Sequence, residues 1–320
     1  MEKRLLLPRE TYIVEYPEAV KFADTQLGIF WSPDEVKVEK DVQDILVNMT
    51  ESERHGVITT LKLFTMYELI VGGEYWQNLV FNNFQRPADI QRMAKCFSFV
   101  ELCIHAPFYS KINDALGLSS DEFYTEYLND DVLKSRIELL HSGATCDNLP
   151  LALAHLAITE GVILYSNFAF LKHFQSQGKN KLLNVVRGIN FSARDENLHS
   201  EASAWLFRQM EKEGYFNKED IEGLVTDACL IAYDHESKII DKIFEKGRIE
   251  GITETQMKRF VESRINTVLT NLGYRRLYDI NYNPIAEWFY NGINTYISND
   301  FFTGQGREYV RTWEEKGFVW

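Results

Sequence analysis

The chain has 320 residues, of which 45% are hydrophobic, and this is enough for a substantial core in one or two domains. Its formal net charge of -13 argues against nucleic-acid binding, which requires a basic face. The four cysteines lack paired metal-ligand spacing, and no positively charged leader followed by an apolar stretch opens the chain. We therefore expect a reduced, cytoplasmic protein without a secretion signal.

The sequence divides into three predicted parts. Residues 1–39 form an N-terminal arm that we expect to be extended, apart from a helix around residues 18–26. Residues 40–298 carry the helical signals, and alternating strand patterns bounded by hairpin turns are scarce there. Residues 299–320 are rich in aromatic, glycine and charged residues and form a C-terminal tail. These features predict an all-α fold with one helical domain and irregular ends.

Capping patterns mark three helix starts in the central part. The Ser/Thr-x-x-Glu/Gln pattern, typical of a helix N-terminus, occurs at residues 50–53, 119–122 and 253–256. The first of these leads into an apolar-periodic run that reaches the glycine pair at residues 72–73. Pro284 follows the last long helix.

One apolar run, residues 151–171, has the length of a membrane span. Polar residues interrupt it, and Glu160 lies near its middle, where a charge is costly in lipid. We therefore expect a buried helix of a helical bundle, and no membrane.

Glutamate and histidine residues at helical spacing are the most informative feature of the chain. Glu196 and His199 are three apart, so on a helix they share one face and can bind one metal ion. Glu101 and His105 form a second pair, and two further acids lie alone in apolar helical stretches. Four acids and two histidines are the ligand set of a two-metal site inside a helix bundle. The candidate ligands are Glu68, Glu101, His105, Glu160, Glu196 and His199.

These residues also have ordinary structural interpretations. An isolated Glu-x-x-His is usually an exposed turn of a helix. Glu160 lies between Ile158 and Val162, so it either points outwards or needs a partner charge, because a bare buried carboxylate is costly. No Arg or Lys lies within a turn or two, which favours a metal as that partner. Glu68 is equally consistent with a ligand and with a solvent-facing acid near a helix end.

The spacing of Glu101 and His105 is four residues instead of three, which predicts an irregular helix. Pro107 has no N–H to bond to the carbonyl of Cys103, and its ring crowds that carbonyl. We expect a kink or an inserted-residue bulge, which would bring Glu101 and His105 to the positions of a three-residue spacing.

Oxygen-rich ligands with only two histidines suit iron or manganese better than zinc or copper. Tyr109 lies one turn beyond His105 on the same face. A tyrosine close to an oxygen-activating metal pair can be oxidised to a radical. Ordinary core packing beside Phe108 explains the position of Tyr109 equally well.

With these residues in view, the chain resembles the small, radical-generating subunit of class I ribonucleotide reductases over nearly its whole length. Four features come in the family's order: Phe-Trp-x-Pro-x-Glu-Val at residues 30–36, the Glu160 helix, Ala-Arg-Asp-Glu-Asn-Leu-His at 193–199, and Asn-Pro at 283–284. The resemblance implies a ferritin-like helical bundle, a homodimer, and a dinuclear metal centre that is held by the six candidate ligands.

The resemblance also implies roles for residues around the metals. Tyr109 falls at the family's radical tyrosine, and Phe168 would belong to the apolar wall that shelters it. Trp31 and Asp195 fall at the positions that carry an electron towards the large subunit, with His105 linking them to the metals. The C-terminal tail would dock in that large subunit, which reduces the ribonucleotide.

The chain departs from the family pattern in several places. Glu68 stands where the family usually has Asp, and Glu is familiar there from a subgroup with a manganese–iron pair and no tyrosyl radical. We expect a diiron centre, with Mn/Fe or Mn/Mn as alternatives. Leu102 occupies the place of the acid in strict spacing, and Leu164 stands where a large aromatic is common. Candidates for a relay residue in the tail are Tyr309, Trp313, Phe318 and Trp320.

Two other functions use a similar ligand set, namely a stand-alone ferritin-like dimetal oxidase and a metal-storage protein. Trp31 together with Asp195 argues against the oxidase, because an enzyme that acts alone needs no long electron path. Metal stores are typically shorter and assemble into closed shells.

Overall fold

The computed structural model describes residues 3–7, 13–85, 88–280 and 282–290. Within these ranges the chain is helical, which confirms the predicted all-α class, and β-pairing is limited to an isolated bridge between Ile249 and Ile252. The predicted tail at residues 299–320, with its candidate relay residues, lies outside the described residues. The predicted division into an arm, a bundle and a tail stays a prediction.

The described helices fall into three kinds. The α-helices are α1 (Pro17–Gly28), α2 (Glu51–Ile70), α3 (Ala88–Val100), α4 (Ala106–Ala115), α5 (Asp121–Thr125), α6 (Asp131–Ala144), α7 (Leu149–Gly161), α8 (Tyr165–Lys172), α9 (Leu183–Lys212), α10 (Glu222–Ile243) and α11 (Glu254–Leu272), and residues 284–290 are α-helical as well. The 3₁₀ turns are η1 (Pro33–Glu35), η2 (Val38–Asp41), η6 (Glu126–Asn129), η7 (His173–Gln175) and η8 (Lys218–Ile221). The π-helices are η3 (Asp44–Asn48), η4 (Val71–Phe81) and η5 (Glu101–His105).

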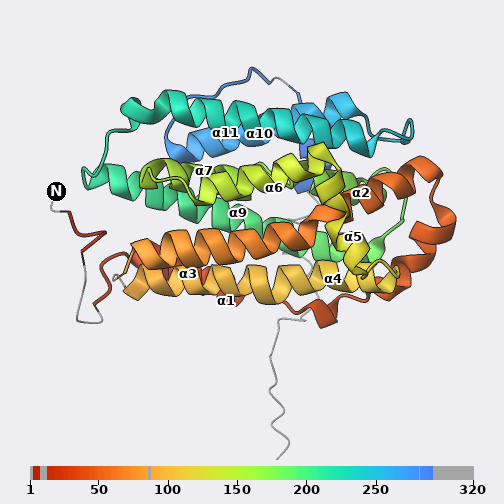
Figure 1. The fold of residues 1–320 in the computed structure, drawn as a ribbon, viewed down its shortest axis with the longest axis horizontal. Helices are drawn as coiled ribbons and strands as arrows, with labels where there is room; N and C mark the ends of the chain where they lie inside the picture. Colours follow the sequence, from red (N-terminus) through yellow and green to blue (C-terminus); the bar gives the residue numbers. More distant parts are fainter. Residues whose placement is uncertain (1–2, 8–12, 86–87, 281, 291–320) are drawn as a thin grey trace, which may run out of the picture.

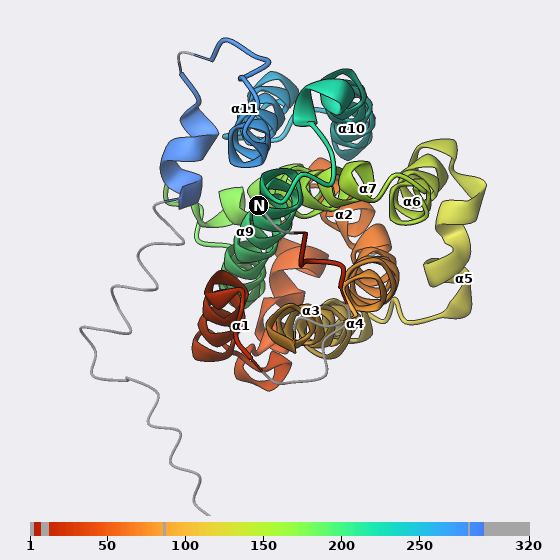
Figure 2. The ribbon, with the colours of Figure 1, turned by 90° about the vertical axis from the view of Figure 1, so that its left-hand side faces the viewer.

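The long helices form a bundle with α7 and α9 packed along each other at its centre (Figures 1 and 2). On one side of this pair lie α2 with η4, and α3 with η5 and α4. On the other side lie α10 and α11, while α1 packs against α3 and α9. The predicted helix of the N-terminal arm is therefore α1, and it covers the bundle. In this arrangement α2, η5, α7 and α9 meet in the interior.

The capping patterns begin helices as predicted, with one shift of a residue. Thr50 and Thr253 each accept a hydrogen bond from the backbone three residues on, and the Glu or Gln at that position bonds back to the cap, so both form capping boxes. In the third pattern the cap is Ser120 instead of Ser119, and its hydroxyl accepts from the N–H of Phe123.

The helix that begins after the capping pattern at residues 50–53 continues beyond the glycine pair at residues 72–73. α2 passes directly into the π-helix η4, which runs to Phe81. Gly72 is needed here for close packing, because a Cβ on it would lie 2.8 Å from the Cβ of Glu101. The absence of a side chain therefore lets η4 and η5 approach each other.

The apolar run at residues 151–171 is buried, as predicted for a bundle helix, but it is not one continuous helix. The segment Leu149–Gln175 is long and apolar enough to cross a membrane, and 78% of its most apolar window is buried inside the protein. α7 ends at Gly161, and Leu164 adopts a left-handed φ of 79° before α8 begins. The break leaves the carbonyl of Gly161 free to accept a hydrogen bond from Nε of Arg264 at 2.8 Å.

Candidate metal centre

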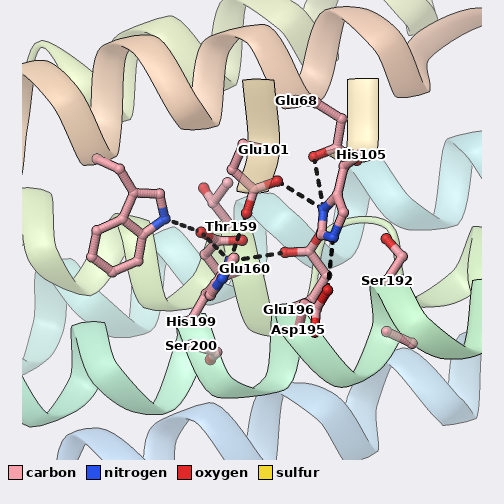
Figure 3. A network of polar contacts seen from close by, with 12 residues as sticks. Glu68, Glu101, His105, Thr159, Glu160, Ser192, Asp195, Glu196, His199 and Ser200 are labelled. Carbon is pink, nitrogen blue, oxygen red and sulfur yellow. Dashed lines mark hydrogen bonds and ion pairs between the residues drawn. The ribbon is translucent and has the colours of Figure 1, made fainter. Parts of the chain in front are cut away.

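The six candidate ligands converge in the interior of the bundle (Figure 3). They come from four elements: Glu68 from α2, Glu101 and His105 from η5, Glu160 from α7, and Glu196 and His199 from α9. None of these residues is more than 1% exposed. They form two overlapping groups, in each of which one ligand atom per residue lies within 4.8 Å of the others. Glu68 and His105 belong to the first group, and Glu160 and His199 to the second. Both groups contain Glu101 and Glu196. This burial excludes the solvent-facing alternatives for the acids.

The π-helix η5 is the irregularity that Pro107 predicted. The N–H of Ala106 bonds five residues back to the carbonyl of Glu101. The extra residue in this turn lets Glu101 and His105 face the same site, with Oε2 of the glutamate 2.9 Å from Nδ1 of the histidine. Leu102, which holds the place of the acid in strict spacing, is only partly buried.

Both histidines present Nδ1 to the carboxylates. In His105, Nδ1 lies 2.9 Å from Oε2 of Glu101. In His199, Nδ1 lies 2.5 Å from Oε1 of Glu101. The other ring nitrogen, Nε2, faces an oxygen outside the cluster in both residues. In His105 it lies 3.2 Å from Oδ2 of Asp195, and in His199 it lies 3.0 Å from Oε1 of Gln26. Because both outer partners are acceptors, they would keep a proton on Nε2 and leave the lone pair of Nδ1 to a metal, once the metal has displaced the Nδ1 proton that Glu101 favours in the metal-free protein. This is the tautomer that a histidine needs in order to bind a metal at the centre of the cluster.

The charges of the cluster are poorly balanced without a cation. Burial raises the pKa of Glu68 and that of Glu196 well above their usual value, and Glu101 adds to both shifts. Burial also opposes the ionisation of Glu101, but the two adjacent imidazoles lower its pKa below the usual value. Burial lowers the pKa of His199, yet its carboxylate neighbours raise it overall to about 9. Bound cations would relieve this repulsion between carboxylates.

Unpaired buried atoms point the same way. Both carboxylate oxygens of Glu68 and of Glu196, and one oxygen of Glu160, are buried without a hydrogen-bond partner. Such atoms are costly unless a cation satisfies them. Among the described residues, the ion pairs recorded for these acids are with the two cluster histidines and not with Lys or Arg. The donor set therefore fits hard divalent cations such as iron and manganese.

Trp31 is connected to the cluster through Asp195. Its indole Nε1 donates to Oδ2 of Asp195 at 2.8 Å, and the same oxygen lies 3.2 Å from Nε2 of His105. The ring of Trp31 is buried, and its centroid lies 5.9 Å from that of His105 and 5.4 Å from that of Phe191. The structure thus brings together Trp31, Asp195 and His105, the three residues that the family resemblance connects.

Tyr109 lies in the interior of the bundle. The residue is fully buried, and its hydroxyl oxygen is 2.9 Å from Oγ of Ser192. Its ring packs on Phe64 with the centroids 4.3 Å apart, and Phe64 in turn contacts Phe168 at 5.8 Å. Burial raises the pKa of Tyr109 well above its usual value, and Glu68 adds to the shift, so the phenol is protonated at neutral pH.

Four residues beside the cluster were not predicted, namely Gln26, Phe64, Trp76 and Ser192. Trp76 donates from Nε1 to Oε1 of Glu160 at 2.5 Å. Ser192 precedes Glu196 by one helical turn, so the rule that residues four apart share a face could have found it. Gln26 and Trp76 lie on other elements, and no local spacing relates them to the ligands.

The chain matches the family model described as ribonucleotide reductase, small chain, over residues 9–284. It is 25% identical to the ribonucleoside-diphosphate reductase subunit beta of Halalkalibacterium halodurans, covering 95% of this chain and 89% of that protein. It is 24% identical to the ribonucleoside-diphosphate reductase 2 subunit beta of Escherichia coli K12, covering 88% of this chain and 86% of that protein. The crystal structure of the dimanganese(II) NrdF of Streptococcus sanguinis superposes with a TM-score of 0.77 at 20% identity, covering 90% and 99% of the two chains.

The structural likeness confirms the predicted ferritin-like helical bundle. The family match spans every candidate ligand as well as Trp31, Tyr109 and Asp195. It favours a reductase subunit over the stand-alone oxidase and the metal store. The chain therefore belongs to the ribonucleotide reductase small-chain family, and it is the small subunit of a class I enzyme, an oxidoreductase.

Proposed function

We propose that this subunit generates the oxidising equivalent, holds it at Tyr109 and passes it through Trp31 to the large subunit. The observation that carries the proposal is the buried chain of contacts from the ligand cluster through His105 and Asp195 to Trp31. A metal store or a stand-alone oxidase has no use for such a connection. A subunit that must oxidise a group in another protein requires one.

The metals would be held by the two overlapping ligand groups, with Glu101 and Glu196 shared between the two ions. We assign a diiron pair, with Mn/Fe or Mn/Mn as alternatives. The alternatives are supported by Glu68, which departs from the usual family residue, and by the dimanganese state of the NrdF from Streptococcus sanguinis. When bound, the pair supplies the activation of dioxygen from which the oxidising equivalent comes.

The chain's own residues would then hold and direct this equivalent. Tyr109 suits a radical because its side chain is fully buried. It packs against rings, among them Phe64, that keep water and stray reductants away from it. Asp195 orients His105 through Nε2 and accepts the indole N–H of Trp31, so it can hold the proton if the indole is oxidised. These contacts fix the geometry of transfer before the partner docks.

The partner would be the large subunit of the reductase, reached through the tail at residues 299–320, and the chain would form a homodimer. The relatives are named as acting on ribonucleoside diphosphates, and we extend that substrate class to this enzyme. The four free cysteines support a cytoplasmic location.

Metal loading tests the proposal. The apoprotein would be loaded with iron, manganese or both, exposed to air, and mixed with the large subunit, with deoxyribonucleotide formation and the electron paramagnetic resonance spectrum measured together. Activity should require metal, and Tyr109→Phe should abolish both a tyrosyl signal and turnover. Tyr75→Phe is a matched control, because this buried hydroxyl donates to the carbonyl of Leu140 instead. A fully active Tyr109→Phe protein would contradict the assignment of the radical to Tyr109.

A further inference from the structure

We propose that Ser192 is a positioning residue that hydrogen-bonds the phenol of Tyr109 before oxidation and its radical oxygen afterwards. This inference rests on the proposed function, which assigns the radical to Tyr109. The two hydroxyl oxygens are 2.9 Å apart, and both residues are fully buried. Either oxygen can be the donor in this contact.

The hydroxyl of Ser192 is used differently from that of a neighbouring serine. Ser203 lies on the same helix, α9, and its hydroxyl bonds to the carbonyls of His199 and Ser200, which is common for a serine within a helix. Ser192 instead contacts Tyr109, which lies 83 positions away on α4. The serine also lies one turn before Glu196, so the helix that supplies two of the candidate ligands supplies this contact too.

The chemistry of the phenol requires a partner that can both accept and donate. The protonated phenol can donate its O–H to Ser192. Oxidation would break that O–H bond: the metal pair that the six candidate ligands would hold would accept one electron, and a carboxylate of the ligand cluster would take up the proton. The remaining radical oxygen can only accept a hydrogen bond. A serine hydroxyl can rotate from acceptor to donor, and it therefore suits both states.

The surroundings make this single contact important. The rings of Phe64 and Phe108 lie 4.3 Å and 5.0 Å from the ring of Tyr109, centroid to centroid, and they exclude water from the pocket. In such a low-dielectric site a hydrogen bond is stronger than in water, and a lost partner is not replaced by solvent. Removing the hydroxyl of Ser192 should shorten the lifetime of the radical by roughly fivefold to tenfold, the scale of one hydrogen bond.

High-field electron paramagnetic resonance of the metal-loaded protein, prepared in H₂O and in D₂O, tests the inference. The wild-type tyrosyl radical should show a g-value lowered by a hydrogen bond and a coupling to one exchangeable proton that D₂O removes. Ser192→Ala should lose both features, whereas Ser192→Thr, which keeps a hydroxyl, should retain them. Ser203→Ala is the matched control, because it removes a buried hydroxyl from the same helix without touching Tyr109, and its spectrum should equal that of the wild type.

Two results would overturn the inference in distinguishable ways. If the wild type gives a tyrosyl signal and Ser192→Ala gives the same g-values and the same exchangeable coupling, the role of Ser192 is wrong and the proposed function stands. If loaded wild type gives no tyrosyl signal, the radical assignment falls, and the role of Ser192 falls with it. Metal content and circular dichroism of each variant establish that the compared proteins are folded and loaded.

Discussion

The two ligand groups make a quantitative prediction, because they share Glu101 and Glu196 but not Glu68. Loss of Glu68 should affect one ion, whereas loss of Glu101 should affect both. Ala substitutions at Glu68 and Glu101 therefore separate a shared ligand from a terminal one. The quantity compared is the gain in stability when each apoprotein is loaded with metal, because each substitution also changes the charge repulsion in the apoprotein.

The magnitude follows from binding linkage. An ion at a free concentration of 1,000 times its Kd stabilises the folded state by about 4 kcal/mol, so two ions contribute about 8 kcal/mol. At roughly 2 °C per kcal/mol for a chain of this size, loading should raise the melting temperature of the wild type by about 16 °C. Under the same conditions Glu68→Ala should gain about half of that rise, and Glu101→Ala should gain little.

Calorimetry of apo and loaded proteins, with metal counted per chain after desalting, measures these gains. The wild type should retain two ions, Glu68→Ala one, and Glu101→Ala close to none. Glu74→Gln is a suitable control, because Glu74 also pairs with a histidine, His141 at 2.8 Å, but it is half-buried and outside both groups. Equal losses of metal and stability in the Glu68 and Glu101 variants would refute the shared-ligand geometry.

Three further predictions concern residues outside the ligand cluster. Trp31→Phe should leave the tyrosyl signal intact but abolish turnover with the large subunit, and loss of its 2.8 Å bond to Asp195 should cost about 1 kcal/mol in a denaturant melt. Gly188→Ala would place a Cβ into the ring of Phe108, so calorimetry should show a loss of about 1–3 kcal/mol. Burial lowers the pKa of Lys172 to about 7. Above that pH the lysine is protonated in the unfolded chain but not in the folded one, so the unfolded chain binds more protons. The free energy of unfolding therefore rises by up to about 1.4 kcal/mol per pH unit, until the lysine of the unfolded chain also loses its proton. Lys172→Met should remove this rise from a series of melts between pH 7 and 10.

Much of the candidate ligand set could be predicted from the sequence, because helical geometry is local. Residues three or four apart share a face, so Glu196 and His199 are paired before any tertiary contact is known. The π-helix at Glu101 and His105 was predictable for the same reason, since Pro107 disturbs the hydrogen bonds of its own turn. Acids in apolar helices are also informative, because burying an unpaired charge is costly.

The tertiary structure alone decided what surrounds those ligands. Gln26 and Trp76 reach His199 and Glu160 from α1 and η4, and contacts between elements distant in sequence depend on packing instead of on spacing. The spacing of four residues from Glu196 places Ser192 on the ligand face of α9, but only packing decides that its hydroxyl contacts a tyrosine of α4 instead of a carbonyl of its own helix. Local hydrogen bonding and periodicity thus determine which side chains lie on one helical face. Only the close packing of several helices determines which faces meet. It therefore determines which hydrogen-bond partners fix the tautomer of each histidine and which rings pack beside each ligand.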